Sequence, residues 1–407
     1  MVADNNKQVC SSAITNILAL RYNPEEKTFI KKASWQDFVE SEYQNNNSII
    51  LQLLKNVIQQ VDFKEKKITI ALSAGIDSSL VLALLKEYLP DVKITALTLT
   101  FSQSVDESQL SSKIANFFDI DHKIIHIKNF LNELPNALHI LKNPHYDVMN
   151  TYYLVKNSKK ISNVLVTGDG GDEIFGGYTF RYSKFNNLVN ETSSIEEKIQ
   201  SYLNCHERDW VPDQEQIFGE KIQFSWKKIH QTLRPYFDNT LSSLNQVFLA
   251  DFNGKLLYNF IPNYNKFYNH FGVQSFSPFL NKEIIDYGSH LPIVKKYDHQ
   301  TNMGKLILRN LLNEKIPKHL QPSSKQGFSV NTVSLWKQFG NEICRQYLLD
   351  SRLVKDNWLN GDWIKNNFYK ADQEKNIRYI NKFFSLLGFE IWYRLFVTKE
   401  IHPNHTL

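Results

Sequence analysis

Two short loops hold the residues of this sequence whose types and spacing could do chemistry. One reads SAGIDSS (residues 73–79) and the other reads GDGGDE (residues 168–173). Small residues let the backbone approach a ligand closely, backbone N–H groups and hydroxyl groups bind phosphate, and carboxylates bind cations. Both loops therefore offer groups that an anionic substrate and a metal ion require.

The first loop is typical of a pyrophosphate-binding turn. A strand that runs into small residues and then into a helix presents several backbone N–H groups at the helix N-terminus. Ser73 and Ser78 add hydroxyl groups, and Asp77 can hold a Mg²⁺ ion. An ordinary strand-to-helix turn with a serine cap is the alternative, because short motifs recur by chance.

The second loop crowds three carboxylates into five residues. Asp169, Asp172 and Glu173 repel one another unless a cation or a substrate ammonium lies among them. A solvated acidic turn or a calcium loop is the alternative interpretation. The two loops together are more specific than either alone, and they predict a Mg²⁺ ion shared by Asp77 and Asp172.

The elements around these loops predict a parallel sheet. Apolar, β-branched runs alternate with segments of helical periodicity. The expected strands are residues 68–72, 94–101, 122–127 and 164–168, and the expected helices are residues 48–61, 80–89 and 105–118. This order predicts an α/β fold with a doubly wound parallel sheet, in which ligands bind at the carboxyl ends of the strands.

Three parts are expected along the chain. Residues 1–46 form an N-terminal extension, residues 47–186 form the α/β core, and residues 187–407 form a large, mostly α-helical part that completes the site. The last boundary rests on a change from strand patterns to long aromatic-rich helical stretches. No flexible linker marks it.

Composition narrows the class of protein. The chain has 407 residues, 42% of them hydrophobic, and a formal net charge of +5, so a globular fold is expected and a nucleic-acid partner is not. Three cysteines without a CxxC pair favour neither a disulfide framework nor a zinc site. The sequence shows no signal peptide and no bilayer-spanning run, so we expect a cytoplasmic protein without a membrane partner.

Longer motifs identify a family resemblance. SAGIDSS resembles the SGGxDSS loop of N-type ATP pyrophosphatases (the PP-loop, adenine nucleotide alpha-hydrolase-like fold), and VLVTGDGGDEIFGGYTFRY is very similar to the signature loop of asparagine synthetases. PFLN (278–281), GKLILR (304–309) and KQGF (325–328) resemble the family's PFLD, GKxxLR and KxGF. The resemblance extends from about residue 47 to residue 392.

The resemblance implies ATP and Mg²⁺ as cofactors and a small-molecule carboxylate as substrate. The carboxylate would attack the α-phosphate to give an acyl-adenylate and pyrophosphate, and an amine would then displace AMP to form an amide. The activity implied is that of an AMP-forming carbon–nitrogen ligase, as in asparagine biosynthesis.

The same resemblance implies roles for individual residues. Asp77 and Asp172 would bind Mg²⁺. Asp169 would act as the general base, Lys325 would stabilise charge at the acyl centre, and Lys305 would contact phosphate. ATP-binding positions are implied at Ser73, Ala74, Gly75, Asp77, Ser78, Ser79, Leu99, Gly168, Asp169 and Gly170.

Glu173 is expected to be structural rather than catalytic. In that role it would pair with Arg181 or Arg309.

Several positions depart from the family pattern. Ala74 stands where the family has glycine, and its methyl group would be strained in some φ > 0 conformations. The family's ExRxPFLD reads QSFSPFLN (274–281), without the glutamate and the arginine. Asn265–Lys266 replaces an acidic–basic pair, and Asn269 replaces a methionine. These changes lie on the acceptor side, so the carboxylate need not be aspartate.

The glutaminase domain that usually precedes this region is expected to be missing. Residue 2 is Val, and Cys10 is too far from the terminus to be its nucleophile. Residues 19–34 resemble only the final strand of such a domain. The amine would then be free ammonia, ammonia from a separate subunit, or an amine on another substrate.

Three further functions compete with an asparagine-forming synthetase. The scaffold could join another carboxylate to an amine, as β-lactam synthetases and lasso-peptide cyclases do. It could be a non-catalytic ATP-binding partner, although clustered carboxylates have no purpose in an idle domain. A tRNA-modifying pyrophosphatase is weakened by the small net charge and the lack of paired cysteines.

Overall fold

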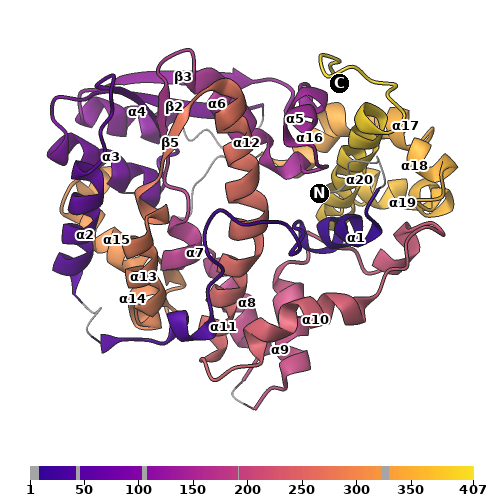
Figure 1. Cartoon of the computed structure of the whole chain (residues 1–407), viewed down its shortest axis with the longest axis horizontal. Helices are drawn as coiled ribbons and strands as arrows, with labels where there is room; N and C mark the ends of the chain where they lie inside the picture. Colours follow the sequence, from indigo (N-terminus) through magenta and orange to yellow (C-terminus); the bar gives the residue numbers. More distant parts are fainter. Residues whose placement is uncertain (1–8, 43–45, 103–107, 191, 322–329) are drawn as a thin grey trace.

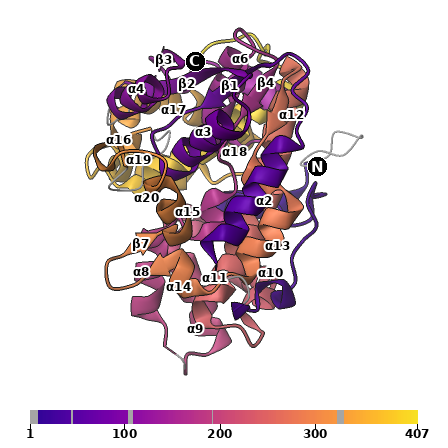
Figure 2. The ribbon, with the colours of Figure 1, turned by 90° about the vertical axis from the view of Figure 1, so that its left-hand side faces the viewer.

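A five-stranded parallel sheet lies at the centre of the fold. The computed structural model describes residues 9–42, 46–102, 108–190, 192–321 and 330–407. The strand order is β3-β2-β1-β4-β5, and every neighbouring pair is parallel (Figures 1 and 2). The strands are β1 (Lys67–Ala71), β2 (Lys93–Phe101), β3 (Asp121–Ile127), β4 (Val164–Val166) and β5 (Gln274–Phe276).

The four strands expected from the sequence are confirmed. The fifth, β5, escapes sequence analysis because it has three residues, of which two are exposed and one is half-buried. It pairs with β4 in the register Val166 to Phe276, so a segment from the helical half extends the sheet. This pairing places residues 277–281 next to the second loop.

Both faces of the sheet are covered, as a doubly wound fold requires. Ile68, Ile70 and Ile94 pack on one face with α2 (Asn47–Gln59), α3 (Ile76–Tyr88) and α4 (Ser108–Phe117). Leu97 and Leu165 pack on the other face. The helices of that second face are α5 (Leu134–Leu141), α6 (Met149–Ser158), α12 (Ile261–Phe271) and α20 (Ile377–Phe396).

The remainder is mostly helical, as expected. The other helices are α8 (Thr179–Leu188), α9 (Ile195–Cys205), α10 (Trp226–Phe237), α11 (Ser243–Asp251), the π-helix η5 (Phe252–Phe260), α13 (Lys282–His290), α14 (Ile293–Lys296), α15 (Leu306–Asn313), α16 (Thr332–Leu335), α17 (Asn341–Leu348), α18 (Arg352–Lys355) and α19 (Gly361–Asp372). A short antiparallel ribbon, β6 (Tyr297–Asp298) and β7 (Met303–Gly304), precedes α15. In Figure 1, α16 to α20 gather around the C-terminal end of the chain. Across the described ranges, none of the helices has the length and apolar character needed to cross a bilayer.

The N-terminal segment packs into the helical half. Residues Ser11–Leu20 form α1, and its apolar residues at helical spacing, Ile14, Ile17 and Leu18, are buried beside α20. Residues 19–34, whose sequence resembles the final strand of a glutaminase domain, form no strand. These residues form the end of α1 followed by irregular backbone that leads to a short 3₁₀ helix at Trp35–Phe38.

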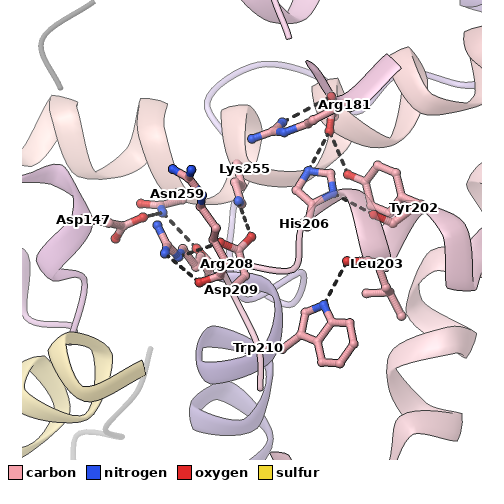
Figure 3. Close-up of polar contacts among 12 residues, drawn as sticks. Asp147, Arg181, Tyr202, Leu203, His206, Arg208, Asp209, Trp210, Lys255 and Asn259 are labelled. Atoms are coloured by element: carbon pink, nitrogen blue, oxygen red, sulfur yellow. Dashed lines mark hydrogen bonds and ion pairs between the residues drawn. The ribbon is translucent and has the colours of Figure 1, made fainter. Parts of the chain in front are cut away.

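A buried ionic cluster fastens this segment in place. The Arg21 guanidinium lies 2.8 Å from the Asp209 carboxylate. Figure 3 shows Lys255 in contact with the same carboxylate. The Asn259 amide donates to the Arg21 carbonyl and to Asp147, each at 2.9 Å. Burial raises the pKa of Asp209, but the two cations outweigh it and hold the pKa well below its usual range. The cluster connects α1 to η5, which forms part of the site described next.

Candidate active site

The first loop folds as the turn that the sequence predicts. Gly75 is the N-cap residue of α3, which begins at Ile76 directly after β1 and the small residues. The Ser78 hydroxyl accepts a hydrogen bond from the Ser73 backbone N–H at 3.3 Å and donates to the Gly75 carbonyl at 3.3 Å. These bonds hold the turn closed at the carboxyl end of β1, where an anion would meet the N-terminus of α3.

Ala74 adopts the strained conformation that its methyl group makes unfavourable. Its φ is 55°, in the left-handed region that favours glycine, and its side chain is fully buried. An alanine in this left-handed conformation lowers the free energy of unfolding by about 1 kcal/mol, compared with an alanine at φ < 0. The loop keeps its shape despite the substitution because Ser73 and Ser78 hydrogen-bond across it.

Ala74→Gly is expected to leave the free energy of unfolding within about 1 kcal/mol of the wild type. The relief of backbone strain offsets the loss of one buried methyl group, about 0.8 kcal/mol, and the added freedom of the unfolded chain. Chemical denaturation measures the resulting change in the free energy of unfolding. A loss larger than about 2 kcal/mol would show that the methyl group contributes packing beyond its own burial.

The second loop packs directly on the first. A Cβ atom at Gly168 would lie 2.7 Å from the Asp77 Cβ, and one at Gly171 would lie 2.6 Å from the Asp77 Cγ. Gly170 has a φ of 89°, which turns the chain from β4 into the short helix α7 (Gly171–Phe175). The glycines of the second loop therefore make the space that the Asp77 side chain occupies.

Gly171→Ala is expected to lower the free energy of unfolding by about 2 kcal/mol, because the new methyl group must displace Asp77. The matched experiment combines it with Asp77→Ala, which removes the atoms in the way. The penalty in the double variant should then be smaller than the sum of the two single penalties, a coupling that chemical denaturation resolves. Strictly additive losses would contradict the contact.

Lys305 joins the two loops from the helical half. Its ammonium contacts the Asp77 carboxylate and lies 2.7 Å from Asp172 Oδ1. Burial alone lowers the pKa of Lys305, but the carboxylates of Asp172 and Asp77 outweigh it and raise the pKa above its usual range. Lys305 has a φ of 57° at the N-terminus of α15, and strained residues of this kind cluster at functional sites.

Asp77 and Asp172 fit the ligand set expected for Mg²⁺. Their carboxylates reach the same cation, Lys305, so both can also face one metal ion. Two carboxylates completed by substrate phosphates and water are a common Mg²⁺ environment. Within the described ranges, no group of three or more His, Cys, Asp and Glu side chains could hold a metal ion alone.

Asp169 lies beside this cluster with an altered pKa. The loss of hydration raises the pKa to about 6, the charges of Asp77 and Asp172 add to the rise, and a hydrogen bond from Thr167 opposes it. The Thr167 hydroxyl donates to Asp169 Oδ2 at 2.7 Å, and the Ser277 hydroxyl donates to the Asp169 carbonyl at 2.7 Å. A carboxyl group with this pKa can accept a proton near neutral pH. The contacts of Thr167 and Ser277 with Asp169 are not predictable from the sequence, because Ser277 reaches Asp169 only through the pairing of β5 with β4.

Other implied residues have different surroundings. Glu173 accepts a hydrogen bond from the Tyr178 hydroxyl at 2.5 Å, and Arg181 pairs with Asp251 at 3.4 Å, so the pairing of Glu173 with Arg181 or Arg309 stays a prediction. Leu99 is buried in β2 and is not among the residues that line the cavity described next. Lys325 lies outside the described residues.

A cavity of about 250 Å³ opens where the two loops meet. One half is lined by polar residues of the loops, including Ser73, Asp77, Asp169, Asp172 and Glu173. The other half comes from α6, η5 and α12 and is lined by Asn150, Thr151, Leu154, Leu256, Phe260, Ile261, Tyr264 and Tyr268. The structure thus gathers residues from three distant parts of the sequence around one space.

Comparison with known proteins agrees with this geometry. A family model described as asparagine synthase matches residues 50–394. Asparagine synthetase [glutamine-hydrolyzing] 1 of Bacillus subtilis is 25% identical over 374 residues, which cover 82% of this chain and 57% of the relative. Asparagine synthetase B of Escherichia coli is 21% identical and covers 70% of this chain and 45% of the relative. The chain thus spans about half the length of these curated relatives.

Solved structures give weaker matches. A U34-tRNA thiolase from Methanococcus maripaludis aligns with 81% of this chain and 80% of its own at 13% identity, with a TM-score of 0.29. NMN synthetase from Francisella tularensis aligns with 50% of this chain and 91% of its own at 16% identity, with a TM-score of 0.27. Alignments with such low TM-scores and identities carry no information about the candidate active site.

Proposed function

This chain belongs to the asparagine synthase family, and from that premise we propose that it is an ATP-dependent, AMP-forming amide synthetase. The observation that carries the proposal is the convergence of Asp77, Asp172 and Lys305 beside Asp169, at the carboxyl ends of β1 and β4. Anion-binding backbone, a paired cation and a carboxyl group of raised pKa are the parts that carboxylate activation and amine attack require.

The first step is activation of a carboxylate. An oxygen of the substrate carboxylate attacks the α-phosphorus of ATP, the bond to the β-phosphate breaks, and pyrophosphate leaves. The Ser73–Ser79 loop would bind the phosphates through backbone N–H and hydroxyl groups. Mg²⁺, held by Asp77 and Asp172, would supply positive charge to the phosphate oxygens. Lys305 would add a second cation, and Lys325 is proposed to stabilise charge at the acyl centre.

The second step forms the amide. The nitrogen of an amine attacks the acyl carbon, the bond from that carbon to the AMP oxygen breaks, and AMP leaves. Asp169 would accept the proton that the amine loses, which its pKa of about 6 permits at neutral pH. Thr167 and Ser277 position it for this transfer.

The amine would be ammonia, free or supplied by a separate subunit, or an amino group on another molecule. Aspartate and ammonia are one candidate pair. The changes at Gln274 and Phe276 favour a different carboxylate, as in enzymes of the β-lactam synthetase or lasso cyclase kind. Phe276 supports this view, because it packs edge-on against Phe63 at 5.7 Å and offers no charge to a substrate.

The test measures release of pyrophosphate and AMP from Mg-ATP with a panel of carboxylates, with and without ammonium. Carboxylate-dependent release is expected, and the acid that responds identifies the substrate. Release with aspartate and ammonium alone would specify an asparagine-forming enzyme. ATP binding without release for any acid would favour a non-catalytic partner, and the absence of ATP binding would refute the proposal.

A further inference from the structure

The half of the cavity formed by α6, η5 and α12 is mainly apolar and aromatic, with Asn150 and Thr151 as its polar, uncharged members. Phe260 and Tyr264 stack with their ring centroids 5.7 Å apart and their planes 12° from parallel. Leu154 and Tyr268 are buried within the same wall. The rings come from the end of the π-helix η5 and the helix α12 that continues it, and π-helical turns are frequent at functional sites.

This wall adjoins the reacting group. Burial raises the pKa of Tyr264 and of Tyr268 well above the usual tyrosine value, and the charge of Asp169 adds to the rise in both. Both rings line the same cavity as Asp169. A molecule whose reacting atom lies at Asp169 would place its remaining atoms against them.

The basic side chains of α12, Lys266 and His270, line another cavity. Lys266, two residues from both Tyr264 and Tyr268 and so on another face of the helix, lines this separate cavity together with Lys142 and His270. Its ammonium donates to the Asn263 side chain at 3.3 Å. Among the described residues of the apolar half, all eight lining side chains are uncharged.

Free aspartate suits this wall poorly. Its α-carboxylate group would lose hydration against Phe260, Tyr264 and Leu154 with no cation among the described residues of this wall, which is costly for an ion. The nearby carboxylates of Asp169 and Glu173 would also repel its α-carboxylate. A hydrocarbon chain or an aromatic ring would instead gain by displacing water from the same surface.

We infer that one of the two substrates carries its reacting group, the carboxyl or the amine, on an apolar aliphatic or aromatic body that packs between α6 and α12. The inference rests on the proposed function, since that function defines the two reacting groups. It makes Leu154, Phe260 and Tyr264 specificity-determining residues of the site.

The test is a chain-length series measured by titration calorimetry. Binding to the wild-type chain is measured with Mg²⁺ and α,β-methylene-ATP, which resists cleavage at the reacting bond. One arm uses straight-chain carboxylates from acetate to octanoate, with aspartate for comparison. The other uses straight-chain amines from methylamine to octylamine, with ammonium for comparison.

One series should bind about fourfold more tightly for each added methylene group until the cavity is full, as burial of hydrocarbon implies (about 0.8 kcal/mol per group). The responding arm shows whether the acid or the amine carries the apolar body. The absence of any dependence on chain length in both arms would overturn the inference.

Two leucine variants locate the wall. Leu154→Ala enlarges the cavity, so affinity should continue to rise for longer chains than in the wild type. Leu203→Ala removes an equally buried leucine of α9 that does not line the cavity, and it should leave the limiting chain length unchanged. Equal limiting lengths in both variants would contradict the assignment.

Pyrophosphate release separates this inference from the proposed function. Chain-length dependence without release by any member would support the apolar site and contradict the synthetase activity. Pyrophosphate release with aspartate and ammonium, together with no chain-length dependence in either series, would support the synthetase activity and contradict the apolar site.

Discussion

Asp169→Asn should abolish amide formation and, above about pH 6, raise the stability of the protein. A positioned general base contributes about a hundredfold to ten-thousandfold to the rate, so turnover should fall by that factor. Asparagine keeps an oxygen that can accept the Thr167 hydrogen bond, so the loop should retain its shape. A residue of purely structural importance would lose stability together with activity.

The gain in stability follows from the direction of the pKa shift. The pKa of Asp169 is about 6 in the folded protein, compared with 3.8 as the ordinary value, so the folded state holds this proton more tightly than the unfolded state. Ionisation of Asp169 above pH 6 therefore lowers the free energy of unfolding by about 2–3 kcal/mol. As the pH falls from about 6 to 4, this cost disappears. Asparagine carries no charge at any of these values.

Chemical denaturation at about pH 8 and pH 4 measures this effect. The variant should be more stable than the wild type at the higher pH, and the difference should shrink at the lower one. For the wild type, the pH profile of kcat/KM should fall below about pH 6 as Asp169 becomes protonated. Equal stabilities at both pH values would contradict the raised pKa.

Lys305→Met should lower the free energy of unfolding by about 3 kcal/mol and remove most pyrophosphate release. The substitution leaves Asp77 and Asp172 close together without their shared cation, and breaking a largely buried ion pair from one side is strongly destabilising. Mg²⁺ should restore part of the loss, because it can occupy the space between the carboxylates. Thermal unfolding with and without Mg²⁺ measures this, and the shift should be larger than in the wild type.

Lys315→Met is the matched control. Lys315 follows the same helix and pairs with Glu87, whose side chain is 42% exposed, so its loss should change stability by less than about 1 kcal/mol. Mg²⁺ should have the same effect on this variant as on the wild type. If Mg²⁺ stabilises Lys305→Met no more than Lys315→Met, the two carboxylates do not hold the metal.

The sequence predicted the local units of this site because each is encoded by adjacent residues. An apolar run, small residues and a helical period specify strand, turn and helix, as at β1, residues 73–79 and α3. The missed strand β5 shows the limit, since three partly exposed residues become a strand only through pairing with β4. Residues 19–34 show it too, because their contacts with η5, such as those of Ala33 with Asn253, depend on the tertiary fold.

The sequence by itself predicted the family and the doubly wound sheet, both of which are confirmed, and it pointed to Asp77, Asp169 and Asp172 as candidate reactive carboxylates. Only the tertiary structure decided which cation they meet, since Lys305 lies 228 residues after Asp77. It also decided that Ala74 is strained and that α6 and α12 present an apolar wall to Asp169. The physical reason is that charge pairing, strain and desolvation depend on distances in space, which packing sets and sequence spacing does not.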